Sequence, residues 1–351
     1  MEIEYSKENK KAPAFPKYGC FLIGCGGFFI IAILFLLLVV IGAASSLKDS
    51  FAGSDSKDPF KEELLMRDDN GTWKIAVIDI SGIILNQRSS YGSSVADSED
   101  ICKQLEKAEK DPDVRAVILN LNTPGGEVTA ADDIYQAVVK LKKRKPVIAL
   151  MNSIATSGGY YVAVACNKII ASRLTMTGSI GVIITSYNYK GLLDKIGVSA
   201  EVYKSGEMKD MLNGARTRTP QEVAIIQELV NDSYEEFIGL VSAGRKIPVG
   251  KIRGTEIGDG RVLHGGKALK LGLIDQLGRM KEAVESAEKL SKSRPGSLKV
   301  VRYKRTASLM DFLFGAAESG RSNIQVRMPG ISAETELPRG RLYFLPENLS
   351  R

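Results

Sequence analysis

The sequence predicts an α/β fold that follows a membrane-spanning helix. Short runs of aliphatic and β-branched residues alternate with longer segments of helical period, and strands that alternate with helices are typical of a layered parallel sheet. The membrane span is predicted by a run from 21 to 44 without a charged residue, because roughly 20 such residues cross a bilayer. Hydrophobic residues make up 44% of the 351 positions, which is ample for a folded core.

The N-terminal segments are expected to hold the chain in the cell membrane as a single-pass protein. They comprise a cytoplasmic arm at 1–20, the anchor at 21–44 and a polar linker at 45–73. Lysines before the span favour a cytoplasmic N-terminus and an extracytoplasmic domain, although the lysines of the linker weaken this bias. Because the apolar run is longer than a typical signal-peptide core, we expect an uncleaved anchor.

The compact domain is expected at 74–290, and a basic C-terminal tail is expected at 291–351. Thr219, Pro220 and Glu222 form a helix start signal, with a cap, a proline at the first position and then an acid. The tail could lie on an anionic membrane surface or be a solvated charge run. Strands are predicted at 74–80, 114–121, 147–151, 168–171 and 180–185, and helices at 98–110, 127–143, 160–166 and 220–244.

Ser157 lies at the predicted turn between the strand at 147–151 and the helix at 160–166, and Gly158 and Gly159 follow it. A serine at such a turn projects its hydroxyl clear of the backbone. It also sits beside the free N–H groups of the helix N-terminus, which can hold a developing oxyanion. The alternative is that Ser-Gly-Gly forms only a tight turn.

A second glycine-rich loop, with Gly125 and Gly126, ends the strand at 114–121 and opens the next helix. In a parallel sheet both loops would open on the same edge, where ligands bind. Backbone N–H groups at this helix start could also face an oxyanion. A plain glycine turn is again the alternative, but two such loops at strand-to-helix turns favour a functional site.

The histidine and cysteine content and the net charge limit which kinds of catalytic and binding sites the chain can form. His264 is the one histidine, so a His-rich zinc site is excluded and a Ser-His-Asp triad would have to use this residue. It lies in a polar turn and is expected to be a loop residue, which makes a lysine the better candidate for a base. The four cysteines have no paired spacing that would indicate a disulfide framework. The net charge of +7 is largely in the tail, and no nucleic-acid recognition motif occurs.

Five motifs, in this order along the chain, resemble those of the signal peptide peptidase A family. This family comprises membrane-anchored serine proteases of the Clp protease/crotonase fold, and the resemblance covers about 74–290. The motifs are Thr-Pro-Gly-Gly at 123–126, Ser-Gly-Gly-Tyr-Tyr at 157–161, Thr-Gly-Ser-Ile-Gly at 177–181, Lys-Ser-Gly-Glu-Met-Lys-Asp at 204–210, and Gly-Arg-Val at 260–262 with Leu-Gly-Leu-Ile-Asp at 271–275.

The resemblance implies a role for each site residue. Ser157 would be the nucleophile, Lys209 the general base, and Ser179 a residue that orients the lysine, while the Gly126 and Gly158 N–H groups would form the oxyanion hole. No cofactor or metal is implied. The residues alone do not select Lys209, since Lys204 lies nearby in the same motif. Thr156 stands where many relatives carry alanine.

The resemblance also implies the substrates and the assembly. The expected substrates are signal peptides already released into the membrane and other unfolded membrane-proximal segments. The chain carries one copy of each motif and corresponds to a single-length member, for which a homo-oligomeric ring is implied, with Ser157 of one subunit beside Lys209 of its neighbour. Two alternatives remain: a crotonase-like acyl-CoA enzyme and a non-catalytic scaffold of the same fold.

Overall fold

A computed structural model describes residues 59–66, 71–86, 95–305 and 343–344. The expected cytoplasmic arm, the anchor at 21–44 and most of the expected linker lie outside the described residues. Within the described ranges, no helix is long and apolar enough to cross a membrane. The described strands and helices all belong to the unit Phe60–Arg351.

The main sheet has nine strands and is mostly parallel. Its principal order is β1-β12-β2-β5-β7-β8-β11, and β9 pairs with both β7 and β10. Among the described strands of this sheet, the β1–β12 and β9–β10 pairs are antiparallel and the other pairs are parallel. The strands are β1 (Phe60–Met66), β2 (Lys74–Ser81), β5 (Val114–Thr123), β7 (Val147–Thr156), β8 (Lys168–Ala171), β9 (Met176–Gly178), β10 (Val262–His264), β11 (Gln276–Leu277) and β12 (Lys299–Arg305).

A second, smaller sheet lies at the end of β5 and has the order β13-β6-β3-β4. Ile84 of β3 pairs with Gly126 of β6, which joins this sheet to the loop expected to supply an oxyanion donor. Its strands are β3 (Ile83–Leu85), β4 (Val95–Asp97), β6 (Gly126–Glu127) and β13 (Tyr343–Phe344).

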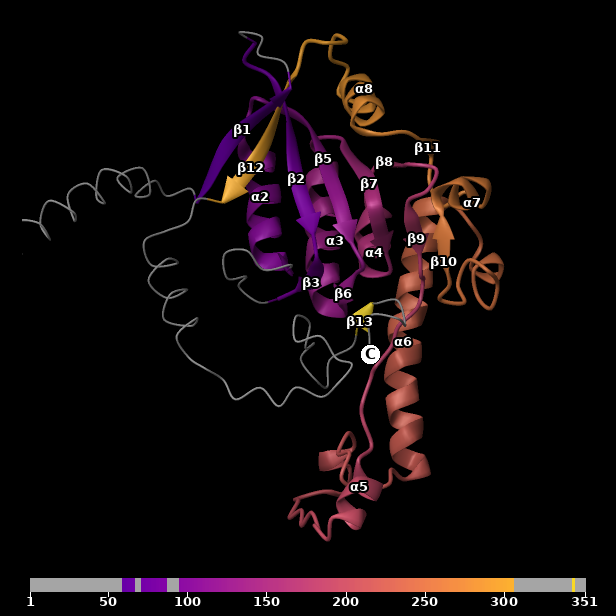
Figure 1. Ribbon diagram of the computed structural model, residues 1–351. Helices are drawn as coiled ribbons and strands as arrows, with labels where there is room; N and C mark the ends of the chain where they lie inside the picture. The colour runs from indigo at the N-terminus through magenta and orange to yellow at the C-terminus, as the bar shows by residue number, and fades with distance from the viewer. Residues whose placement is uncertain (1–58, 67–70, 87–94, 306–342, 345–351) are drawn as a thin grey trace, which may run out of the picture. The chain divides into compact units, whose positions relative to one another are not determined.

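Helices pack on both faces of the main sheet (Figure 1). One face is covered by α2 (Ser98–Lys110), α3 (Val128–Lys142), α4 (Gly158–Ala163) and α6 (Pro220–Arg245), whose apolar residues share one core. The opposite face is covered by α8 (Met280–Leu290), over a second core. Short helices complete the fold: α5 (Lys190–Lys195), α7 (Gly265–Lys270), η1 (Glu207–Asp210) and η2 (Val249–Lys251).

The start of α6 confirms its predicted capping signal. The Thr219 side chain accepts from the Glu222 backbone N–H, and the Glu222 carboxylate accepts from the Thr219 backbone N–H. Pro220 occupies the first turn, where its missing donor has no consequence. These interactions satisfy two N–H groups that the helix cannot satisfy itself, so α6 begins where the sequence places it.

The predicted strand at 180–185 is wrong. The strand in this region is β9, which ends at Gly178. Gly178 and Ser179 have φ of 77° and 50°, and two successive left-handed residues turn the chain out of an extended path. Ile180 is fully buried all the same, which explains the apolar pattern. The sheet also includes β1 and β12, from segments that the sequence placed in the linker and the tail.

Between β9 and α6 the chain forms an exposed extension, residues 184–219, which we call the lysine arm. It carries α5 and η1, and Gly214 is its only buried residue. Its two ends meet, because the Arg218 guanidinium donates to Ser186 Oγ at 2.6 Å. The Tyr189 N–H also donates to the Gly214 carbonyl at 2.8 Å. The lysine arm is therefore a long loop closed on itself beside the start of α6 (Figure 1).

Candidate active site

Ser157 occupies a sharp turn between the end of β7 and the start of α4. Its φ of 51° and ψ of −113° lie in a region that costs residues with a side chain of order 1–3 kcal/mol. Its N–H donates to the Gly178 carbonyl at 2.8 Å, which fixes the turn to β9. The side chain is fully buried, and its Oγ has no hydrogen-bond partner among the described residues. A buried, unpartnered hydroxyl on strained backbone is expected of a nucleophile rather than of a structural serine.

Two glycine-containing loops meet beside Ser157. A Cβ added at Gly158 would lie 3.1 Å from the Gly126 nitrogen and 3.2 Å from Gly125 Cα, so the backbones of the two loops are in direct contact. The first N–H groups of a helix have no acceptor within that helix, which leaves the Gly158 N–H at the start of α4 without an intrahelical partner. The structure therefore brings both expected oxyanion donors next to Ser157.

Thr156 connects the two loops through its side chain, a role that the sequence did not reveal. Its Oγ1 donates to the Pro124 carbonyl at 2.9 Å, and the side chain is fully buried. The only sequence signal was a hydroxyl where many relatives carry alanine. The bond fixes the loop that carries Gly126 against the turn that carries Ser157.

Ser179 lies immediately beside Ser157 in the fold. Thr156 of β7 pairs with Gly178 of β9, so the residues that follow them leave the sheet side by side. Ser179 is 3% exposed, and its N–H donates to the Arg261 carbonyl at 2.9 Å. Ser179 is thus a buried residue that follows β9 next to the turn that carries Ser157.

Lys209 is not brought to Ser157 by this chain. It lies in η1 on the lysine arm, is exposed to solvent, and its side chain makes no ion pair or hydrogen bond with any residue that the structure describes. Asp210, the next residue, is bound to Arg216, which in turn is bound to Glu222 in the first turn of α6. Lys209 is therefore anchored near the N-terminal end of α6.

The same helix contacts the nucleophile region much further along. The Phe237 ring packs against the Tyr161 ring at a centroid distance of 5.1 Å, and the Tyr161 N–H donates to the Ser157 carbonyl at 2.8 Å. Glu222 and Phe237 are separated along α6 by a rise of about 22 Å, at roughly 1.5 Å per residue. The serine and the lysine thus lie near opposite ends of one long segment of α6.

The other candidate bases are accounted for. Lys204 forms an ion pair with Asp210 at 2.7 Å and also donates to the Glu207 carbonyl at 2.8 Å, so its amine is occupied. His264 ends the strand β10 rather than lying in a loop, and it is exposed to solvent. Neither residue reaches the Ser157 hydroxyl, which has no partner in the described ranges.

Charge on the lysine arm is concentrated around Arg216. Its guanidinium holds the pKa of the Asp210 carboxyl well below the usual range and lowers the pKa of Glu222 to about 2. The hydrogen bonds to the Glu222 and Asp210 carboxylates raise the pKa of Arg216 in return, and Glu222 has the larger effect. All three groups are therefore charged at any pH at which the enzyme is expected to work.

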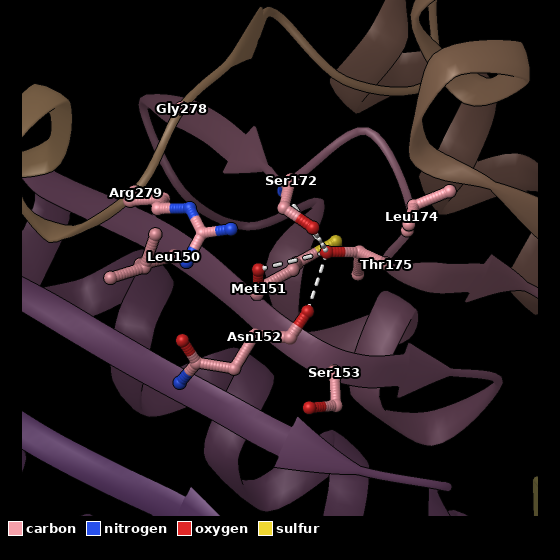
Figure 2. A pocket seen from close by; sticks show the side chains of 9 residues that line it. All are labelled: Leu150, Met151, Asn152, Ser153, Ser172, Leu174, Thr175, Gly278 and Arg279. Carbon is pink, nitrogen blue, oxygen red and sulfur yellow. Dashed lines mark hydrogen bonds between the residues drawn. The ribbon is translucent and has the colours of Figure 1, made fainter.

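A cavity of about 310 Å³ lies on β7 just before the nucleophile (Figure 2). Thr175 sits at its centre and donates to the Met151 and Asn152 carbonyls. Ser157 is not part of the cavity lining, so this is a feature separate from the catalytic turn. The lining residues are Leu150, Met151, Asn152, Ser153, Ser172, Leu174, Thr175, Gly278 and Arg279.

No group of three or more His, Cys, Asp or Glu side chains within the described ranges could hold a metal ion.

Comparison with known proteins identifies the family. The model of peptidase family S49 matches residues 139–294, a range that contains both Ser157 and Lys209. A relative from Enterococcus faecium, which carries the provisional name signal peptide peptidase SppA, is 34% identical over 75% of this chain and 74% of its own length.

Two longer relatives match over a smaller share of their length. The chloroplastic serine protease SPPA of Arabidopsis thaliana is 34% identical over 71% of this chain and 37% of its own length. Protease 4 of Haemophilus influenzae is 35% identical over 63% of this chain and 35% of its own length. These matches are to peptidases and not to acyl-CoA enzymes. The chain therefore belongs to peptidase family S49, and its activity class is that of a serine-type peptidase.

Proposed function

We propose that this chain is a membrane-anchored serine endopeptidase that uses a Ser157–Lys209 dyad on a Clp protease/crotonase-like fold. The observation that carries the proposal is the turn at Ser157, where a buried hydroxyl without a partner lies against two backbone loops. Serine hydroxyls need a base before they attack a carbonyl, and the lysine with an unoccupied side chain in the 204–210 motif is Lys209.

The mechanism follows from these positions. The neutral amine of Lys209 takes the proton of Ser157, whose Oγ then attacks the peptide carbonyl. The Gly126 and Gly158 N–H groups hold the tetrahedral oxyanion, a contribution typically worth 10²–10³ in kcat for one donor. Lys209 protonates the leaving amine, and water then hydrolyses the acyl-enzyme. In this proposal Ser179 orients the lysine amine, since its backbone leaves the sheet next to that of Ser157.

We propose that the dyad forms between neighbouring subunits of a ring. Within one chain the two residues lie near opposite ends of a segment of α6, and the Ser157 hydroxyl has no partner among the residues that the structure describes. The lysine arm also exposes large apolar side chains: Leu192 is 60% exposed, Ile196 61% and Tyr203 92%. Exposed apolar side chains of this size favour an interaction surface when they form a contiguous patch, and a head-to-tail contact closes into a ring when its rotation allows.

The substrates that we propose are released signal peptides and other unfolded membrane-proximal segments. The Enterococcus faecium relative is named for this substrate class. The uncharged run at 21–44 would keep the catalytic domain at the outer face of the cell membrane, where apolar peptide remnants collect. The N-terminus would then be cytoplasmic. Peptides and the membrane are the partners of the chain, and nucleic acid is not.

Labelling with a serine-directed fluorophosphonate tests the nucleophile. The assembled wild-type protein should be labelled at Ser157, whereas assembled Ser157→Ala protein should remain unlabelled and inactive. A folded and assembled wild-type protein that resists labelling would contradict the assignment.

Mixed assemblies test the shared site. Ser157→Ala subunits and Lys209→Ala subunits, each inactive alone, should regain activity when they are assembled together. With random mixing in equal amounts, roughly a quarter of head-to-tail interfaces pair an intact serine with an intact lysine. Verified mixed rings that stay inactive, beside active rings assembled from wild-type subunits by the same route, would show that both residues act within one chain.

A further inference from the structure

Arg216, in the lysine arm, lies between η1 and the first turn of α6. On one side its Nε and Nη2 donate to the two carboxylate oxygens of Asp210 at 2.9 and 2.7 Å. On the other side its Nη1 donates to Glu222 Oε2 at 2.9 Å, and its Nη2 also donates to Glu222 Oε1. One guanidinium thus makes two bidentate contacts, which are the strongest and most directional form of this interaction.

The Glu222 side of this contact is buried and joined to the core through α6. Glu222 is 1% exposed, and its Oε2 also accepts a hydrogen bond from the Thr219 N–H at 2.8 Å. The helix that carries it is fixed to the core by Phe237, Ile238 and Val241, all fully buried. Any group bound to the Glu222 carboxylate is therefore held relative to the core through a continuous helix.

The Asp210 side of the contact carries the proposed base. Asp210 follows Lys209 directly in η1, a turn closed by the Lys209 N–H to the Gly206 carbonyl at 3.1 Å. Apolar packing contributes little here, since the lysine arm buries only Gly214. The turn is therefore held in position by the polar contacts of Arg216 and not by apolar packing.

Lys204 provides a comparison within the same cluster. It also binds Asp210, at 2.7 Å, but its other contact is the Glu207 carbonyl of the same turn. Lys204 therefore stabilises the turn internally and reaches no residue of α6. Among the described side-chain hydrogen bonds and ion pairs, those of Arg216 join the turn to the helix.

We propose that Arg216 is a positioning residue for Lys209, which it holds in place by clamping Asp210 to Glu222. This inference rests on the proposed Ser157–Lys209 dyad. Arg216 itself does not touch substrate, and its effect on the reaction passes through the placement of the lysine amine. A misplacement of a catalytic group by about 1 Å can cost roughly 10²-fold in rate, so loss of the clamp should reduce kcat far more than it changes KM.

Kinetics of assembled single variants give the first test. Arg216→Met should lower kcat by about 100-fold with little change in KM, and Arg216→Lys should recover only part of the loss because it cannot bind both carboxylates bidentately. Lys204→Met is the matched control and should stay within about fivefold of wild type. Asp210→Asn, which weakens the same clamp from the other side, should also reduce kcat and provides a second route if Arg216→Met fails to assemble.

Mixed assemblies then show whether the loss of Arg216 impairs only the lysine arm or the subunit as a whole. Arg216→Met subunits keep an intact serine, so assembly with Ser157→Ala subunits, which keep an intact lysine arm, should restore activity. Assembly of Arg216→Met with Lys209→Ala subunits should not, because both lysine arms are then defective. Ser157→Ala with Lys209→Ala is the control for the shared site.

The outcomes are distinct. If the control pair stays inactive, the shared site is wrong, and the clamp is judged by the kinetics of the single variants alone. If Arg216→Met keeps activity within about fivefold of wild type, or if it is rescued equally by both partners, the positioning role is wrong while the dyad stands.

Discussion

Gly126 offers a sharp test of the oxyanion hole, because the structure leaves no space for a side chain there. A Cβ added at Gly126 would lie 1.9 Å from the Ile84 carbonyl oxygen and 2.6 Å from the Ile84 nitrogen. Both are backbone atoms of the paired strand β3. In Gly126→Ala, the two strands must therefore separate.

The size of the effect follows from this overlap. Ordinary van der Waals contact begins near 3.4 Å, so the backbone at 126 must move by about 1.5 Å. An oxyanion donor acts at roughly 2.7–3.1 Å, and losing one costs about 10²–10³ in kcat. We expect a kcat reduction of that order, together with a loss of about 1–3 kcal/mol in stability from overpacking.

Peptide hydrolysis by the assembled variant and its thermal unfolding measure the two effects. Gly239→Ala in α6 is the matched control, because a Cβ there would meet nothing within 4 Å. It should retain full activity and gain about 0.5–1 kcal/mol from the helix propensity of alanine. A Gly126→Ala enzyme with activity near that of the control would refute the assignment of this N–H to the oxyanion hole.

Four further predictions follow from the site. Ser157→Ala and Lys209→Ala should each abolish hydrolysis. Because the pair acts as a unit, the steady-state rate of the double variant should be hardly lower than that of either single variant. Losses in rate that add up in the double variant would contradict this. Thr156→Val, which keeps the shape but removes the bond to the neighbouring loop, should lower kcat by roughly fivefold, as about 1 kcal/mol implies, and Thr156→Ser should stay closer to wild type. His264→Ala should keep wild-type activity, because His264 is exposed at the end of β10 and does not reach the Ser157 hydroxyl; an assembled but inactive variant would favour a histidine mechanism. The pKa of Glu222 is lowered in the folded state. Its contribution to anchoring the lysine arm should therefore be complete above its unfolded pKa, near 4.5, and should be lost as the pH falls toward about 2. Cleavage within the arm by an acid protease would detect this loss.

Local sequence determined the start of α6 and the place of the catalytic turn. The cap at Thr219 and Pro220 fixed the start of α6, and the glycines after Ser157 marked the strand-to-helix turn. These features depend on neighbouring residues in the chain, through capping and backbone conformation. The left-handed pair at Gly178 and Ser179 is the exception, since the conformation of a serine at positive φ is imposed by the surrounding structure and not by its own preference.

Tertiary structure decided which groups meet. The sequence could not separate Lys204 from Lys209, but the fold occupies Lys204 with Asp210 and leaves Lys209 exposed. It also brought β12 into the sheet beside β2, from a segment that was expected to be a basic tail. The link from Arg216 to Glu222 likewise depends on how the lysine arm folds back on α6. Such contacts depend on packing between segments distant in the chain, which hydrophobic period and local propensity do not encode.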